Sequence, residues 1–142
     1  ELVYAPAAVA RTVAVVGAGP AGLMCALVAA GRGHRVTLFE AAADLGGQMN
    51  LAALVPGKEE FRGLVAWFAP MVAKAGIDLR LGHEATADDL RGFDEVVIAT
   101  GVLPRDPGIP GQDGPNVLGY AEVLRCAGGA AGGRDRGRGN RF

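Results

Sequence analysis

The sequence predicts an α/β fold in which a parallel sheet carries helices on both faces. Short apolar runs that suit buried strands alternate along the chain with segments whose apolar residues recur at helical spacing. Residues 11–40 show this best, because an apolar strand, a glycine-rich turn, an apolar helix and a second strand follow one another there. About thirty residues make one βαβ unit. This order is typical of a Rossmann-like domain.

Each expected element has a local signal. Strands are expected at residues 11–16, 35–40, 77–82 and 94–101, and helices at 21–30, 58–75, 86–90 and 120–125. Pro20 suits the first turn of the first helix, where its missing N–H costs nothing. Pro70 interrupts the apolar stripe of the second helix and predicts a kink or a restart there. Residues 41–57 are expected to form an irregular loop.

Composition limits the classes of partner. The 142 residues suit one domain, placed at residues 11–125 after a linker at 1–10, and the Gly/Arg-rich residues 126–142 are expected to be a disordered tail. Fourteen basic and fifteen acidic residues nearly cancel, so no net charge favours nucleic acid or an anionic membrane. The sequence shows neither a membrane-spanning apolar run nor a signal peptide, so a cytoplasmic location is expected.

Candidates for catalysis or metal binding are sparse. Cys25 and Cys126 lie far apart in the sequence and show no metal or redox spacing. His34 and His83 are also single, and no cysteine or carboxylate gives either of them metal-ligand spacing. We therefore expect no catalytic residue and no metal site in this chain.

The stretch VAVVGAGPAG, residues 13–22, carries the main chemical signal. Gly17 permits a tight turn out of the strand, and Gly22 lets the helix pack closely against it. Gly19 has no Cβ, so a pyrophosphate could approach the backbone at the helix N-terminus, where N–H groups and the helix dipole favour negative charge. The glycine spacing alone is compatible with any dinucleotide and also with a turn that binds nothing.

Two further features reduce the number of nucleotides that this site could bind. Glu40 ends the second expected strand, where a carboxylate accepts hydrogen bonds from an adenosine ribose and repels a 2′-phosphate. This position favours FAD, NAD or ADP over NADP. The sequence GGQ at residues 46–48 follows, and its paired glycines indicate backbone lying against a ligand.

Several motifs together resemble one family of flavoenzymes. These motifs are GAGPAG, TLFE, GGQMN, PGKEEF, DEVVIATGVLPRDPGIPG and VLGYAEVL, and they run from about Thr12 to Arg125. They resemble the FAD-binding region of the NADPH-dependent 2,4-dienoyl-CoA reductase family, bacterial iron–sulfur flavoenzymes that include trimethylamine dehydrogenase. The resemblance implies an FAD/NAD(P)-binding type of Rossmann-like fold, here incomplete.

The resemblance also implies roles for individual residues. Gly17, Gly19, Pro20 and Ala21 would line the pyrophosphate, with Gly22 behind them, and Glu40 would hold the adenosine ribose. Gly47 and Gln48 would face the ribityl-pyrophosphate or flavin side, Lys58 or Arg62 could offer a cation to the phosphates, Ala85 would make a main-chain contact to adenine, and Ala99, Thr100 and Gly101 would form a turn that returns to the cofactor.

The family resembled here has parts that this sequence lacks. In the full enzymes electrons pass from NADPH through FAD and a 4Fe-4S cluster to FMN in a barrel that reduces the dienoyl thioester. The sequence contains no barrel, no cluster cysteines, no second glycine motif for NADPH and no segment that closes the FAD domain. We expect a domain fragment without turnover of its own, whose partners are the dinucleotide and the remaining domains of the parent enzyme.

Alternatives remain at this stage. The domain could be a structural module that holds ADP and transfers no electrons, as the resemblance to trimethylamine dehydrogenase implies. A free NAD-binding Rossmann protein is disfavoured by GGQ and by the ATG turn at residues 99–101. The abrupt Gly/Arg-rich change after Arg125 is interpreted as a truncated or frame-shifted end, not native to the fold. A missing sheet edge would expose backbone and favour self-association.

Overall fold

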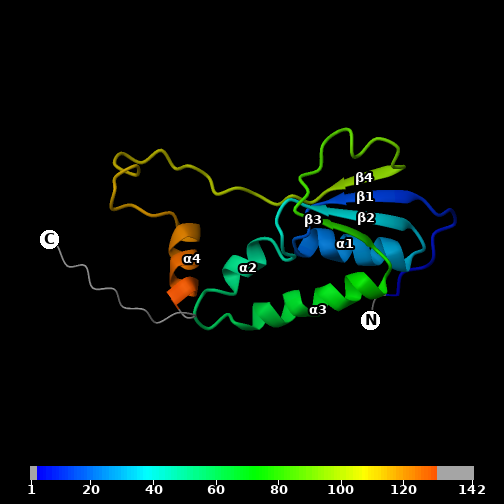
Figure 1. The fold of residues 1–142 in the computed structure, drawn as a ribbon, viewed down its shortest axis with the longest axis horizontal. Coiled ribbons are helices and arrows are strands. Elements are labelled where there is room, and N and C mark those ends of the chain that lie inside the picture. Colours follow the sequence, from blue (N-terminus) through cyan, green and yellow to red (C-terminus); the bar gives the residue numbers. More distant parts are fainter. Residues whose placement is uncertain (1–2, 131–142) are drawn as a thin grey trace.

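The sheet is parallel throughout and has the strand order β3-β2-β1-β4 (Figure 1). The computed structural model describes residues 3–130. The strands are β1 (Thr12–Val16), β2 (Arg35–Glu40), β3 (Asp78–Leu81) and β4 (Glu95–Ile98), and the helices are α1 (Pro20–Gly31), α2 (Gln48–Ala52), α3 (Glu60–Lys74) and α4 (Tyr120–Ala130). The expected Rossmann-like α/β fold is confirmed.

Several elements differ from the expected ones. Helix α2 interrupts the expected loop, and residues 86–90 form a turn instead of a helical segment. Helix α3 continues through Pro70 without a break. Because Pro70 lies on the exposed side, the carbonyl that loses its intrahelical N–H partner can bond to water. Helix α4 extends past Arg125 to Ala130, and the rest of the expected tail, residues 131–142, lies outside the described residues.

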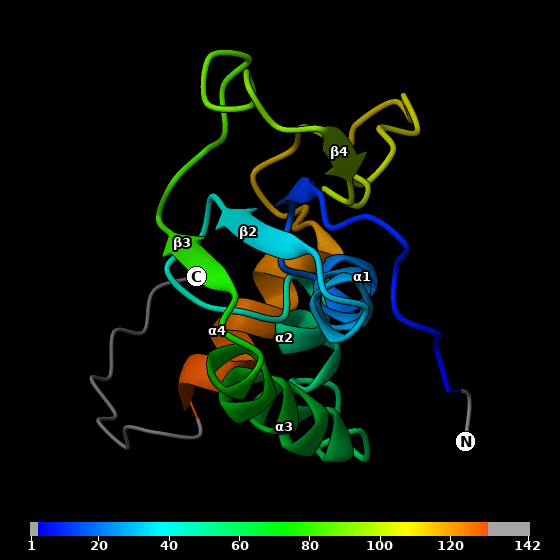
Figure 2. The ribbon, with the colours of Figure 1, turned by 90° about the vertical axis from the view of Figure 1, so that its right-hand side faces the viewer.

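One face of the sheet holds the main hydrophobic core. Alternate residues of β1 and β2 point toward α1 and α3, as the period of two in a strand requires. The buried residues are Val13, Val15, Val36 and Leu38 of the sheet, Leu23 and Ala26 of α1, and Phe68 and Val72 of α3. Figure 2 shows α1 and α3 together on this side of the sheet. This packing fixes α1 directly beneath β1 and β2.

A loop covers the β2 part of the other face, whereas Val96 and Ile98 of β4 are 42% and 65% exposed there. The Phe39 ring is fully buried there, with its centroid 5.5 Å from the His83 ring and 6.3 Å from the Phe93 ring. The Arg80 guanidinium lies 5.1 Å from the same centroid. Within residues 3–130, α1 and α3 are therefore the helices packed on the sheet, both on one face, and residues 82–94 cover part of the opposite face.

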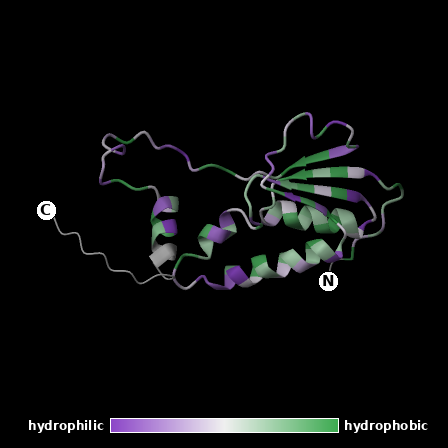
Figure 3. Ribbon diagram, viewed as in Figure 1, coloured by the Kyte–Doolittle hydropathy of each residue, from purple (hydrophilic) through white to green (hydrophobic). Residues whose placement is uncertain are grey.

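The outer side of α1 remains apolar. Figure 3 shows hydrophobic residues around most of this helix, and one of them, Met24, is half exposed. An open groove of about 580 Å³ runs between α1 and α3, with Tyr4, Met24, Trp67 and Met71 in its walls. In the part of the chain that the structure describes, no helix is long and apolar enough to cross a membrane.

Candidate functional site

The candidate site lies at the carboxyl ends of the strands, where the loops after β1, β2 and β4 meet the start of α1 (Figure 1). Three backbone hydrogen bonds tie these loops together. The Gly17 N–H donates to the Phe39 carbonyl (2.8 Å), the Gly46 N–H to the Ala18 carbonyl (2.9 Å), and the Ala99 N–H to the Val16 carbonyl (2.7 Å). Ligands of open parallel sheets bind at this edge.

Two of the three motif glycines are required by the protein's own packing. Gly17 has φ +103°, and a Cβ built there would lie 2.4 Å from the Ala99 carbonyl oxygen. A Cβ on Gly22 would lie 1.9 Å from the Gly17 carbonyl oxygen and 3.3 Å from the Ala99 Cβ. Both contacts are closer than real Cβ atoms come, so these glycines let the glycine loop, α1 and the turn after β4 pack together.

Gly19 is different. Its φ is −73°, which any residue can adopt, and a Cβ built there would meet no atom within 4 Å. Gly19 is the N-cap of α1, next to the first-turn N–H groups that have no partner within the helix. Neither conformation nor packing therefore explains this glycine. The open space above it fits the close approach of a pyrophosphate to a helix N-terminus.

Glu40 is held next to the glycine loop by two backbone donors. Its Oε2 accepts from the Ala18 N–H at 2.7 Å, and its Oε1 accepts from the Ala42 N–H at 2.8 Å. A carboxylate oxygen has more than one acceptor position, so each oxygen can still accept a hydrogen bond from a hydroxyl group. The carboxylate is thus fixed at the end of β2, where an adenosine ribose would need it.

The paired glycines after β2 form a second wall of the site. Gly47 lies against Gly19, since a Cβ built on Gly47 would be 3.3 Å from the Gly19 Cα. A Cβ on Gly46, whose φ is +111°, would be 2.7 Å from Oδ1 of Asn50. The Asn50 Nδ2 donates to the Leu45 carbonyl at 2.8 Å and so fixes this turn. Sequence reasoning missed Asn50, although the GGQMN motif contains it.

The turn after β4 forms the third wall. Ala99 is half buried, and Thr100 and Gly101 are exposed, with φ +77° at Gly101. The Gln48 side chain reaches this turn, and its Nε2 donates to the Val102 carbonyl at 2.5 Å. Gln48 therefore hydrogen-bonds to the backbone of another loop, which the sequence did not reveal.

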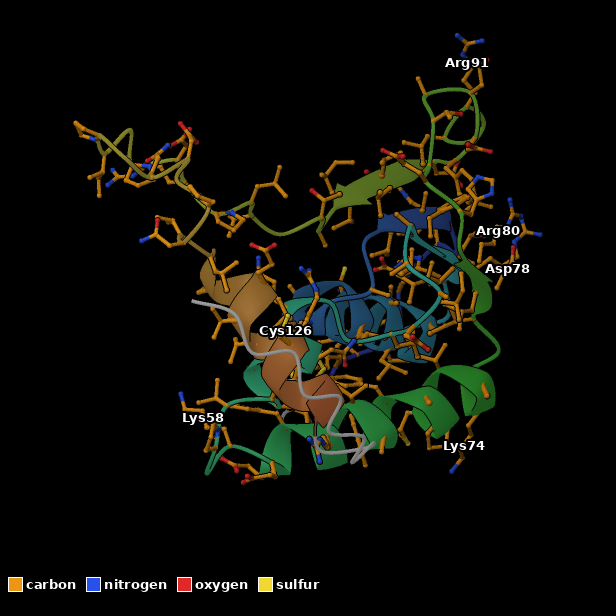
Figure 4. The ribbon with its side chains drawn as sticks, turned by 60° about the vertical axis from the view of Figure 1, so that its left-hand side comes forward. Lys58, Lys74, Asp78, Arg80, Arg91 and Cys126 are labelled. Atoms are coloured by element: carbon orange, nitrogen blue, oxygen red, sulfur yellow. The ribbon has the colours of Figure 1, made fainter. Side chains whose placement is uncertain are left out.

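Two expected cations lie apart from these loops. Lys58 is exposed in the α2–α3 connection and points away from the molecule in Figure 4. Arg62 is exposed in the first turn of α3. Among the hydrogen bonds of residues 3–130, none joins either side chain to the glycine loop. The structure thus does not bring these two residues to the other candidates.

Ala85 lies on the Glu40 side of the site. Two residues earlier, the His83 N–H donates to the Glu40 carbonyl at 2.9 Å, which anchors this segment at the end of β2. Asp89 holds the following turn, because its Oδ2 accepts from the Thr86 hydroxyl and the Thr86 N–H at 2.7 and 2.8 Å. These donors, with a smaller contribution from His83, hold the pKa of the Asp89 carboxyl well below its usual range.

Titratable residues that could bind metal do not cluster in the described part of the chain. No group of three or more histidine, cysteine or acidic side chains is placed to hold an ion there. The geometry presents backbone N–H groups, one fixed carboxylate and open space above glycine. Such an arrangement can bind a nucleotide.

Comparison with known families identifies the domain type. The family described as pyridine nucleotide-disulphide oxidoreductase matches residues 11–130, from just before β1 to the end of α4. The chain belongs to this family. The match includes every loop of the candidate site.

Two characterised relatives illustrate the range of activities. The N,N-dimethylglycine/sarcosine dehydrogenase of Chromohalobacter salexigens is 52% identical over 97 residues, which are 66% of this chain and 14% of that protein. The NADH oxidase of Thermoanaerobacter brockii is 39% identical over 120 residues, which are 83% of this chain and 18% of that protein.

Solved structures agree with this range. A 2-naphthoyl-CoA reductase, solved with 2-naphthoyl-CoA, superposes with a TM-score of 0.81 at 39% identity, covering 86% of this chain and 19% of the reductase. Histamine dehydrogenase from Rhizobium sp. 4-9 superposes with a TM-score of 0.68 at 34% identity, and the match covers 73% of this chain and 16% of the dehydrogenase. The matches confirm the flavin-dependent oxidoreductase family that the motifs resemble, and this chain spans less than a fifth of each of these four relatives.

Proposed function

We propose that residues 11–125 are the FAD-binding domain of a flavin-dependent oxidoreductase. The observation that carries this proposal is Gly19, a glycine at the N-terminus of α1 that the protein's own conformation and packing do not require. A ligand whose phosphates pass over the backbone explains it. Glu40, fixed beside the same loop, supplies the acceptor for an unphosphorylated ribose.

The strand order gives the ligand a direction. Glu40 and Ala85 lie on the β2 side of the glycine loop, whereas the turn at residues 99–101 follows β4 on the other side. The adenosine would therefore lie toward β2, and the pyrophosphate over Gly19, Pro20 and Ala21. The ribityl and flavin half would lie toward Gly47 and the β4 turn. FAD bound there would supply two-electron transfer, and these residues would bind and orient it.

The reaction of the longer protein is a further step of the proposal. In the family resembled by the motifs, NADPH reduces FAD, and electrons pass through a 4Fe-4S cluster and FMN to a 2,4-dienoyl-CoA. The match to a reductase solved with an aryl-CoA thioester supports an acyl-CoA substrate class for the whole enzyme. Since this chain covers less than a fifth of its relatives, it should bind cofactor and show no turnover alone.

A structural ADP module is the second candidate. It is favoured by the difference between the two sides of the site, because the Glu40 side is tied by backbone hydrogen bonds and the β4 turn is exposed. The match to histamine dehydrogenase also falls in the amine-dehydrogenase branch.

Equilibrium binding tests both candidates. The purified 142-residue chain would be titrated with FAD, ADP, NAD and NADP, following flavin fluorescence for FAD and calorimetry for the others. We expect FAD to bind more tightly than ADP, and NADP to bind poorly because its 2′-phosphate faces Glu40. Binding of ADP that is as tight as that of FAD would favour the structural module. Absence of binding by both FAD and ADP would refute a nucleotide site in this domain.

A further inference from the structure

The Gln48 side chain makes a hydrogen bond between two loops of the site that lie far apart in the sequence. Its Nε2 donates to the Val102 carbonyl, although the two residues are 54 positions apart in the sequence. Gln48 begins α2 directly after the paired glycines, and Val102 directly follows the turn at residues 99–101. This hydrogen bond therefore joins the second wall of the candidate site to the third.

The bond matters because the β4 turn has few other anchors. Val102 is 74% exposed and Leu103 is 91% exposed, so packing does little to hold this stretch. Across residues 99–105 in the described structure, hydrogen bonds to the rest of the domain come from the Ala99 N–H to Val16 and from Gln48 to Val102. The first fixes the end of β4, and the second fixes the position of the turn that follows.

The hydrogen bond between Gln48 and Val102 lies on the side of the site that the half of a dinucleotide beyond the pyrophosphate would occupy. Gly47, next to Gln48, lies against Gly19, where the pyrophosphate would pass. The sheet places β4 on the side of β1 opposite to β2, and hence opposite to Glu40. A ligand that extends beyond its pyrophosphate must run between the Gly47 turn and the β4 turn. A ligand that ends at its diphosphate does not reach the residues that follow the β4 turn.

We propose that Gln48 is a positioning residue that makes this site select a complete dinucleotide such as FAD over ADP. By holding the Val102 carbonyl, it keeps the β4 turn close to Gly47, so that the ribityl and flavin half meets a formed wall. The inference rests on the proposed function, and it assigns the distinction between the two candidate cofactors to one side chain.

The test uses Gln48→Met, which keeps the length of the side chain and removes the donor. FAD and ADP affinities would be measured for the wild type and the variant, together with the urea midpoint. Loss of one neutral hydrogen bond should weaken FAD binding roughly 2- to 12-fold. ADP affinity should stay unchanged, and the ratio of the two affinities should fall by the same factor. Gln48→Glu, which also cannot donate, should give the same change in ratio if the Met variant is unstable.

Gln112→Met is the matched control. The Gln112 amide also lies in the loop after β4, but its Nε2 donates to Asp106 and its Oε1 accepts from the Ile109 N–H, both within that loop. It should leave the FAD-to-ADP ratio at the wild-type value.

Each result decides between the claims. An unchanged ratio in both Gln48 variants, or an equal loss of FAD and ADP affinity, would overturn the role of Gln48 while leaving the nucleotide site in place. A wild type that binds ADP and not FAD would overturn it as well. A wild type that binds neither would refute the proposed function itself.

Discussion

Replacing Gly19 by alanine tests whether this glycine is needed for a ligand or for packing. The new methyl group would meet no atom within 4 Å, and the φ of −73° suits alanine. The expected cost to folding is therefore that of a poorer N-cap, about 0.5–1 kcal/mol. The same methyl group would occupy the space through which a pyrophosphate approaches the first-turn N–H groups. Loss of one charge-assisted hydrogen bond there weakens binding by roughly 1.5–3 kcal/mol, or about 10- to 150-fold in Kd.

Gly17→Ala and Gly22→Ala provide the contrast. Their methyl groups would lie 2.4 Å and 1.9 Å from backbone carbonyl oxygens, which cannot move without shifting the loop. Such overpacking costs typically 1–3 kcal/mol and occasionally more. Gly17 adds about 1–2 kcal/mol for a side chain in a left-handed conformation. These two variants should lose stability whether or not a ligand is present.

Urea unfolding without ligand and FAD titration at neutral pH measure the two effects separately. We expect Gly19→Ala to keep most of its unfolding free energy and to lose affinity, whereas Gly17→Ala and Gly22→Ala lose stability first. A Gly19→Ala variant with wild-type affinity for both FAD and ADP would refute the reasoning, because the open space above Gly19 would then have no ligand in it.

Three further predictions concern other parts of the domain. Glu40→Gln should weaken ADP and FAD binding by roughly 1.5–3 kcal/mol in titration calorimetry, and unchanged affinity would show that Glu40 does not hold the ribose. Backbone and then side-chain donors of Thr12 lower the pKa of Asp94, so this contact should stabilise the fold above the ordinary carboxyl pKa and fade as pH falls through the lowered value. The urea midpoint of Asp94→Asn should thus depend less on pH between 7 and 3 than that of the wild type; parallel profiles would contradict this. Ile98 is 65% exposed at the end of β4, the edge strand of the described sheet. The Ile98→Lys variant should therefore reduce any self-association that light scattering detects, and an unaltered mass would place the contact elsewhere.

The first βαβ unit could be predicted almost to the residue because its signals are local. The glycine turn, the apolar helix and the strand ending in Glu40 each follow from neighbouring residues. Helix α2 could not be predicted in this way. It has only five residues, too few to be stable alone, and its packing partners are α3 and α4, which lie elsewhere in the sequence.

The residues of the candidate site likewise differ in whether local sequence could predict their positions. Gly17, Gly22 and Glu40 occupy positions set by spacing, and the structure brings them together at one sheet edge. The contact between Gln48 and Val102 depends on how two distant loops meet, which no local pattern encodes. The family resemblance implied a cation from Lys58 or Arg62, but Lys58 is exposed beyond α2 and points away from the molecule.

The two sides of the proposed cofactor site differ in how firmly the described residues hold them. On the β2 side, Glu40 is fixed by two backbone donors, and the following segment is tied by the Gly82 N–H to the Ala42 carbonyl at 2.8 Å. Binding there pays little ordering cost. On the β4 side, Ala99 is tied to Val16 and packs against the glycine loop, whereas the exposed Val102 is held by the Gln48 side chain, so a ligand that reaches beyond the turn must also order these later residues. For the proposed FAD site, firmer support of Val102 and Leu103 should therefore raise FAD affinity more than ADP affinity, because these residues lie toward the half of the ligand that ADP lacks.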